Sequence, residues 1–143
     1  MSRFSPTPPR PRPDLASLVL RVTVGGLMLF HGVDKIMNGV GWMGGMLEGK
    51  GFPAAMAYGV YVGEIVAPIL LILGVAMRSS ALAIVFTMAM ATYLLHAGDL
   101  LSVGDHGEYA LELQVFYSFG AIAAALMGPG RYAVRTRGWL AKL

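Results

Sequence analysis

The amino-acid sequence predicts an all-α membrane protein, a bundle of four transmembrane helices that run up-down-up-down with both termini in the cytoplasm. Of its 143 residues, 56% are hydrophobic and only 13% are charged, which is outside the range of soluble globular proteins. The apolar residues also fall into four separate stretches, each near the ~20 residues at ~1.5 Å per residue that cross the hydrocarbon core. The chain length fits a single domain.

The first 14 residues are predicted to form a disordered cytoplasmic tail, because they contain five prolines and three arginines. A secretory signal peptide is the rival interpretation, since basic residues precede an apolar stretch. We expect the segment to be retained, because that stretch ends in His31-Gly-Val-Asp-Lys and not in a small-residue cleavage site.

The transmembrane domain is predicted over residues 15–130, with spans at about 15–35, 54–77, 79–96 and 108–127. The first span carries Arg21 as its only charge before its polar end, and the second carries only Glu64. The third has no charge and ends at His96. The fourth opens with Glu108 and Glu112 and stops at a Gly-Pro-Gly sequence.

The basic residues predict the orientation of the chain, because Lys and Arg accumulate on the cytoplasmic side. One side of the predicted membrane carries eight of them, Arg3, Arg10, Arg12, Arg78, Arg131, Arg135, Arg137 and Lys142. The other side carries two, Lys35 and Lys50. We therefore expect a bacterial-type inner-membrane protein with cytoplasmic termini, in which residues 131–143 form a basic tail at the membrane interface. No nucleic-acid surface is expected, since the basic residues lie at the chain ends.

The two lone charges within the spans are predicted to form an ion pair, because a charge at the membrane centre costs at least ~2.5 kcal/mol. Arg21 lies ten residues before His31 and Glu64 lies ten residues after Ala54, so both are expected roughly 15 Å from the outer boundary. Two interpretations stay open. The pair fixes the packing of two spans, or it lines a polar cavity in which Arg21 binds an anion or carbonyl group and Glu64 relays a proton.

A group of polar side chains falls at the outer ends of the predicted spans: His31, Lys35, His96, Glu108 and Glu112. Since histidine titrates near neutral pH, the group favours a hydrogen-bonding and proton-relaying site for a small ligand. Two other sites fit some of the same residues, a divalent metal held by His31, His96 and Glu108, or a haem held by the two histidines. The absence of cysteine excludes disulfides, thiolate-bound iron–sulfur clusters and covalently attached haem.

Several short sequence features occur together in this chain. They are LVLRVTVGGLMLFHGVDKI with Arg21, His31, Gly32 and Lys35, GKGFP with Gly51 and Pro53, GEIVAPILLILG with Glu64 and Gly74, His96 at the end of the third span, GEYALEL with Gly107 and Glu108, and GPGRY. On these features the sequence resembles the DoxX-like family of small four-span membrane proteins over nearly all of residues 15–132.

The resemblance implies membrane quinone chemistry, because the family is linked to thiosulfate:quinone oxidoreductase and to terminal quinol oxidase subunits. We therefore expect a quinone- or quinol-interacting subunit of an inner-membrane oxidoreductase, in contact with lipid, a membrane quinone and a redox partner protein, and able to form a homo-oligomer. The expected ligand-binding residues are Arg21, His31, Lys35, Glu64, His96, Glu108 and Glu112. Arg21 or His31 would hold a carbonyl oxygen, and Glu64 with Glu108 would move protons, so that His31, Glu64 and Glu108 are the catalytic candidates.

Two other functions remain as alternatives. In the first alternative, the chain is a non-catalytic membrane anchor or assembly scaffold for a redox partner, and the polar residues only specify packing. A metal or proton conduit ranks below it, because that function needs a continuous polar path and the inner halves of spans three and four carry no charge.

Overall fold

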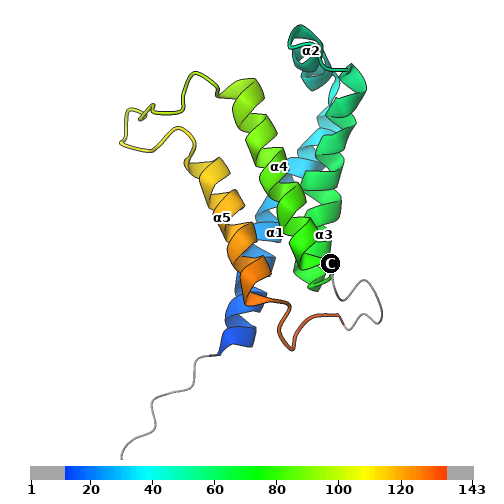
Figure 1. The fold of residues 1–143 in the computed structure, drawn as a ribbon, viewed down its shortest axis with the longest axis vertical. Helices are drawn as coiled ribbons and strands as arrows, with labels where there is room; N and C mark the ends of the chain where they lie inside the picture. The colour runs from blue at the N-terminus through cyan, green and yellow to red at the C-terminus, as the bar shows by residue number, and fades with distance from the viewer. Residues whose placement is uncertain (1–11, 135–143) are drawn as a thin grey trace, which may run out of the picture.

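The computed structural model describes residues 12–134, in which the apolar stretches are helical (Figure 1). The five α-helices are α1 (Pro13–Asn38), α2 (Gly41–Gly49), α3 (Ala67–Leu73), α4 (Met77–Leu95) and α5 (Glu112–Met127). Within residues 12–134 the one β pairing is an isolated antiparallel bridge between Val103 and Tyr109. The all-α prediction is thus confirmed for this range. Most of the two predicted tails, residues 1–11 and 135–143, lies outside the described residues.

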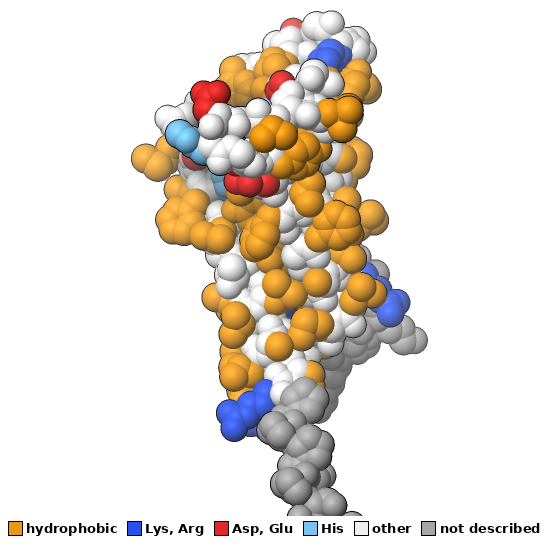
Figure 2. All heavy atoms as spheres, turned by 90° about the vertical axis from the view of Figure 1, so that its left-hand side faces the viewer, with side chains coloured by type: hydrophobic (Ala, Val, Ile, Leu, Met, Phe, Trp, Pro, Cys, Tyr) orange, Lys and Arg blue, Asp and Glu red, His pale blue; other side chains and the backbone are white. Residues whose placement is uncertain are grey.

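The chain has the helices of a membrane protein. Three helical stretches are long and apolar enough to cross a membrane, Pro13–Asn38, Ala54–Leu73 and Met77–Leu95. The fourth, α5, is apolar but has only 16 residues. Large apolar side chains cover the length of the bundle (Figure 2), and Phe30, Leu82, Phe86, Phe119 and Leu126 are among the most exposed. Because such a surface is unfavourable in water, these side chains face lipid.

The two ends of the bundle differ in structure. The α2 end consists of α2 and the loop of residues 96–111, and the terminal end consists of residues 12–17, 74–76 and 128–134 (Figure 1). At the terminal end the Ser17 hydroxyl donates a hydrogen bond to the Gly128 carbonyl oxygen at 2.6 Å. The Arg131 N–H donates to the Asp14 carboxylate at 3.1 Å. The start of α1 is therefore fastened to the segment that follows α5.

The stretch Ala54–Leu73 combines three helical forms. A 3₁₀ segment over Ala54–Gly59 leads into a π-helical turn over Val62–Val66, and α3 completes the stretch. A π turn holds extra backbone and is frequent at functional sites. Glu64 lies within it, with only 7% of its surface exposed. The π turn also packs against α4, because Gly63 has no side chain to meet that of Thr87.

Helix α1 packs closely and antiparallel against this stretch. A Cβ atom at Gly32 would lie 2.5 Å from the Glu64 carbonyl oxygen, and one at Gly25 would lie 2.9 Å from the Pro68 carbonyl oxygen. Both contacts require glycine, since real Cβ atoms do not approach so closely. They place Gly32 level with Glu64. Between the helices lies a core that includes Val24, Met28, Leu71, Ile84 and Ala121.

The helix boundaries between the second and third stretches differ from the predicted spans of 54–77 and 79–96. The second stretch ends at Leu73 and α4 already begins at Met77. Gly74 and Ala76 both have positive φ, 74° and 47°, and this left-handed conformation ends a helix. The connection is therefore a tight turn of three residues, 74–76.

The fourth helix also begins later than predicted. Glu108 was expected at its start, whereas α5 begins at Glu112. The Gly104 N–H donates to the Glu108 carbonyl oxygen at 2.8 Å, and Gly107 has a φ of 84° that permits the turn between them. Glu108 is consequently an exposed loop residue.

Gly32→Ala should destabilise the bundle by about 1–3 kcal/mol, because the added methyl group overpacks the contact with Glu64. Gly26→Ala is the matched control, since a Cβ there has no neighbour within 4 Å, and it should stabilise the same helix by about 0.5–1 kcal/mol. Reversible unfolding in mixed micelles measures both values. Equal effects of the two substitutions would contradict the close approach.

Candidate functional site

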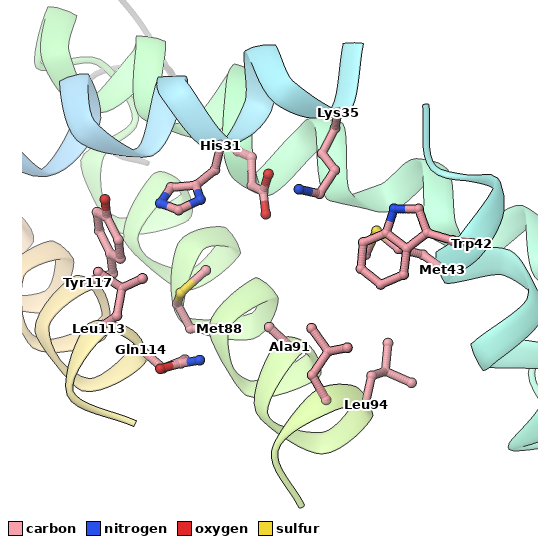
Figure 3. Close-up of a pocket in the computed structure, with 12 residues that line it drawn as sticks. His31, Lys35, Trp42, Met43, Met88, Ala91, Leu94, Leu113, Gln114 and Tyr117 are labelled. Carbon is pink, nitrogen blue, oxygen red and sulfur yellow. The ribbon is translucent and has the colours of Figure 1, made fainter. Parts of the chain in front are cut away.

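A cavity of about 150 Å³ lies toward the α2 end, between α1, α2, the π turn, α4 and α5 (Figure 3). Its lining residues are His31, Lys35, Trp42, Met43, Glu64, Met88, Ala91, Leu94, Leu95, Leu113, Gln114 and Tyr117. Most of this wall is apolar. Polar groups come from four elements, α1, α2, the π turn and α5, so that the cavity exists only when the helices have assembled.

His31 and Tyr117 form an aromatic corner of this cavity (Figure 3). Their rings meet edge to face, with centroids 5.7 Å apart and an interplanar angle of 88°. Tyr117 is 3% exposed, so α5 presents it to the interior and not to lipid. This T-shaped geometry is a favoured arrangement of aromatic rings, and it holds the imidazole beside the cavity.

Glu64 and Gln114 supply the cavity with oxygen atoms that have no hydrogen-bond partner among residues 12–134. The Glu64 Oε2 and Gln114 Oε1 atoms are both buried and accept no hydrogen bond within the described residues. Glu64 reaches the cavity because the close contact of Gly32 sets the π turn level with this part of α1. Buried polar atoms without a partner are uncommon in native proteins and call for a specific explanation.

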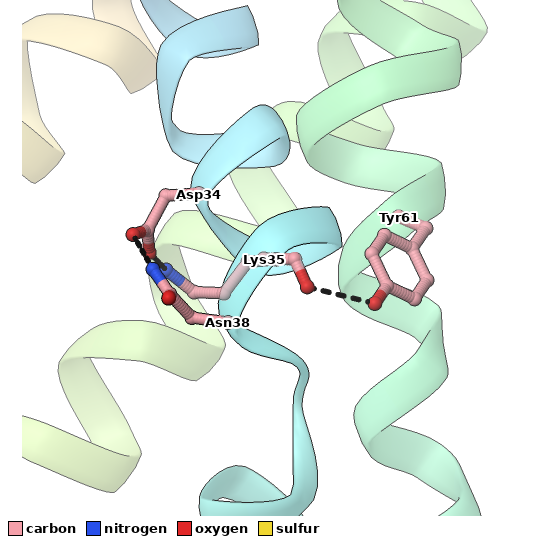
Figure 4. Close-up of polar contacts among 4 residues, drawn as sticks. All are labelled: Asp34, Lys35, Asn38 and Tyr61. Carbon is pink, nitrogen blue, oxygen red and sulfur yellow. Dashed lines mark hydrogen bonds and ion pairs between the residues drawn. The ribbon is translucent and has the colours of Figure 1, made fainter.

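Lys35 provides the positive charge of the site, near the end of α1. Its Nζ atom donates to the Asp34 carboxylate at 3.0 Å, and the Asn38 amide donates to the other oxygen of that carboxylate at 2.6 Å (Figure 4). The Tyr61 hydroxyl donates to the Lys35 backbone oxygen at 3.0 Å and ties α1 to the neighbouring stretch. The ammonium group also lies 6.0 Å from the centre of the Trp42 ring.

A second cavity, of about 100 Å³, adjoins the first. It shares Met43, Glu64, Ala91 and Leu94 with the first cavity, and its other lining residues are Leu47, Met56, Ala57, Gly59, Val60, Phe86, Thr87 and Met90. Thr87 and Glu64 are the only polar side chains of this wall. Met56 and Phe86 are 46% and 62% exposed, so the second cavity reaches the lipid-facing surface between residues 54–66 and α4.

The predicted ion pair between Arg21 and Glu64 is wrong. Arg21 is fully buried, and its Nη1 atom donates to the Ile72 carbonyl oxygen at 2.9 Å, while no ion pair joins it to Glu64. Helix α1 continues to Asn38, 17 residues or about 26 Å beyond Arg21, so Arg21 lies near the terminal end. It meets the last carbonyl groups of α3, where a cation is favourable.

Three further predicted site residues lie away from the cavity. His96 follows α4, and its Nδ1 atom lies 3.5 Å from the Asp99 carboxylate. The Glu108 carboxylate accepts a hydrogen bond from the His106 N–H at 3.0 Å. Glu112 is exposed at the start of α5. No group of three or more His, Asp or Glu side chains within residues 12–134 is arranged to hold a metal ion.

The structure therefore brings His31, Lys35 and Glu64 together and adds two residues that the sequence reasoning did not single out. Gln114 and Tyr117 are three positions apart on α5 and so share one face of the helix. The sequence feature that indicates Gln114 is its amide group inside an apolar helix, because an uncharged polar side chain in such a helix faces protein more often than lipid.

Comparison with known proteins identifies the family of the chain. The model of the DoxX family matches residues 16–97, more than half of the sequence. No curated protein and no solved structure gave a significant match.

A double-mutant cycle of Arg21→Met and Glu64→Gln should give additive changes in the free energy of unfolding, with a coupling below about 0.5 kcal/mol, because the two side chains share no contact. Unfolding in mixed micelles measures the four corners of the cycle. A coupling of about 1.5 kcal/mol or more would restore the ion pair.

Proposed function

The chain belongs to the DoxX family, and on that premise we propose that it is the quinone- or quinol-binding subunit of an inner-membrane oxidoreductase. The observation that carries the proposal is the cavity of about 150 Å³ in which His31, Glu64 and Tyr117 meet within a mostly apolar wall. Ligand sites commonly combine apolar walls with a few placed polar groups.

In this proposal α5 crosses the membrane with the three longer stretches and completes a four-span, up-down-up-down bundle. Its 16 residues rise about 24 Å as a helix, and the adjoining loops can make up the remainder of the ~30 Å core. Arg12, Arg78 and Arg131 lie at or next to the terminal end, which favours a cytoplasmic location for that end. The cavity then lies toward the outer side.

The size and walls of the cavity suit a single substituted ring. An apolar cavity of about 150 Å³ in another protein binds benzene, which is a six-membered ring like that of a quinone. The edge-to-face pair of His31 and Tyr117 offers aromatic packing, and Met88 on α4 offers an adaptable apolar surface (Figure 3).

The polar residues have separate tasks in this proposal. A ring N–H of His31 donates to an oxygen of the ligand, and its imidazole can pass a proton to or from that oxygen. The free oxygen of Glu64 accepts a proton or a hydrogen bond, while Lys35 provides nearby positive charge. A bound quinone or quinol supplies two-electron, two-proton chemistry, and a partner redox protein exchanges the electrons.

The second cavity supports entry of the ligand from the bilayer. It adjoins the cavity of about 150 Å³, which we call the ring-sized cavity, through Glu64. Its other lining side chains are almost entirely apolar. We assign it to the first part of the apolar tail that membrane quinones carry. Phe86 and Met56, both substantially exposed, flank the path to the lipid.

A membrane anchor or assembly scaffold for a redox partner is the second candidate function. The observation in its favour is the loop at the α2 end, where Leu100, Leu101 and Val103 are 52%, 94% and 67% exposed. Apolar side chains that project from a loop beyond the helices form a suitable contact for another protein. Both functions can hold together, since an electron-transfer partner has to dock on the chain.

The protein purified in native lipid should carry quinone, and this quinone should be lost from His31→Ala and Glu64→Gln variants, because both substitutions remove polar groups from the ring-sized cavity. Extraction followed by mass spectrometry measures the amount per chain. Glu112→Gln is the control, since Glu112 is exposed and lines neither cavity. Unchanged quinone in all three variants would contradict the assigned site.

Gly59→Leu should weaken the binding of a long-tailed quinone about tenfold and leave a tail-free ring unaffected. Gly59 lines the second cavity, and a Cβ there meets nothing within 4 Å, so the larger side chain fills the space without displacing its neighbours. Titration in lipid nanodiscs measures both affinities. Gly45→Leu on α2, which is equally unobstructed and lines neither cavity, is the control, and equal losses for both ligands would contradict the assignment of the tail.

A further inference from the structure

The polar atoms without partners point to the kind of ligand that the site prefers. Within residues 12–134, the buried side-chain atoms that make no hydrogen bond are Nε and Nη2 of Arg21, Oε2 of Glu64, Oγ of Ser80 and Oε1 of Gln114. Of these residues, only Glu64 and Gln114 line the ring-sized cavity. Both unpartnered atoms are acceptors, and they reach the cavity from different elements, the π turn and α5.

Neither oxygen accepts a hydrogen bond within residues 12–134, although His31, Lys35, Trp42 and Tyr117, which carry donors, line the same cavity. The cavity wall contributed by α4 consists of Met88, Ala91, Leu94 and Leu95, which have no polar side-chain hydrogen. The Lys35 ammonium group donates to Asp34. A buried acceptor that stays unpaired costs stability. A ligand that brings its own O–H or N–H groups recovers this free energy. A ligand with only carbonyl oxygens has no hydrogen to donate and leaves the two protein oxygens unpaired.

We propose that Glu64 and Gln114 form a pair of acceptors that makes the site select the reduced, dihydroxy form of the ring over its oxidised, dicarbonyl form. The inference rests on the proposed function and names the redox form that the site favours. Each ring hydroxyl donates to one of the two oxygens, and a hydroxyl oxygen can still accept from His31. A carbonyl oxygen accepts only, so it leaves both protein oxygens unpaired.

Gln114 is the specificity-determining residue in this inference. Glu64 serves proton transfer in the proposed function, whereas the Oε1 atom of Gln114 accepts no hydrogen bond within the described residues and has no other role in that function. Substitution of Gln114 therefore changes the preference between the two redox forms with less effect on the rest of the site. Gln114→Glu keeps an acceptor at this position, and Gln114→Leu removes it at similar size.

The experiment uses the full chain in lipid nanodiscs and a matched pair of probes, a short-chain quinone and the corresponding quinol, titrated under anaerobic conditions. We expect the unmodified protein to bind the quinol about tenfold more tightly, from the hydrogen bonds gained. This preference raises the midpoint potential of the bound pair by about 30 mV for two electrons. Gln114→Leu should remove most of the preference, Gln114→Glu should retain it, and Glu112→Gln should leave it unchanged.

The possible outcomes separate this inference from the function on which it rests. Equal or tighter binding of the quinone to the unmodified protein, with loss of both ligands in His31→Ala, would overturn the inference and leave the proposed function in place. Binding of neither form would overturn both. A preference that survives in a folded Gln114→Leu variant, with helicity and elution volume unchanged, would also overturn the role of Gln114.

Discussion

The close approach of α1 to the stretch Ala54–Leu73 determines how the other helices and the cavity are arranged. At Gly32 and Gly25 the two backbones come so near that no side chain fits between them. This contact fixes how far one helix is shifted along the other. It brings Glu64 level with His31 and Lys35, so that an acid from one stretch and the basic residues of another line one cavity. A shift of one helical turn would move Glu64 about 5 Å along the axis and out of this arrangement.

The π turn complements this contact. The π turn over residues 62–66 contains extra backbone compared with a regular α-helix. The side chains around Glu64 therefore point in other directions than they would in a regular helix. Gly63 on the same turn lets α4 approach through Thr87. The turn is therefore packed on two sides, against α1 and against α4, and its position is set by both.

Polar interactions are divided between the two ends of the bundle. At or near the terminal end, Ser17, Arg21 and Asp14 of α1 each bind backbone groups of other segments, which joins the first helix to the end of α3 and to the segment after α5. Toward the α2 end, Glu64 and Gln114 keep unpartnered oxygens beside a cavity. Hydrogen bonds to buried groups favour a single packing arrangement, whereas buried atoms without a partner, which at Arg21 include Nε and Nη2, cost stability.

The membrane character, the helical stretches and the polar residues His31, Lys35 and Glu64 within an apolar chain could be predicted from the sequence, because composition and apolar run length reflect the solvent directly. Which of these residues meet depends on how the helices pack. Spacing along one helix does not give its shift relative to a neighbour. The sequence therefore predicts Arg21 beside Glu64, whereas in the structure Arg21 binds the Ile72 carbonyl oxygen. The turns that end helices at Gly74 and delay α5 until Glu112 depend on local φ values and loop hydrogen bonds. Gln114 and Tyr117 joined the site because α5 packs with that face inward.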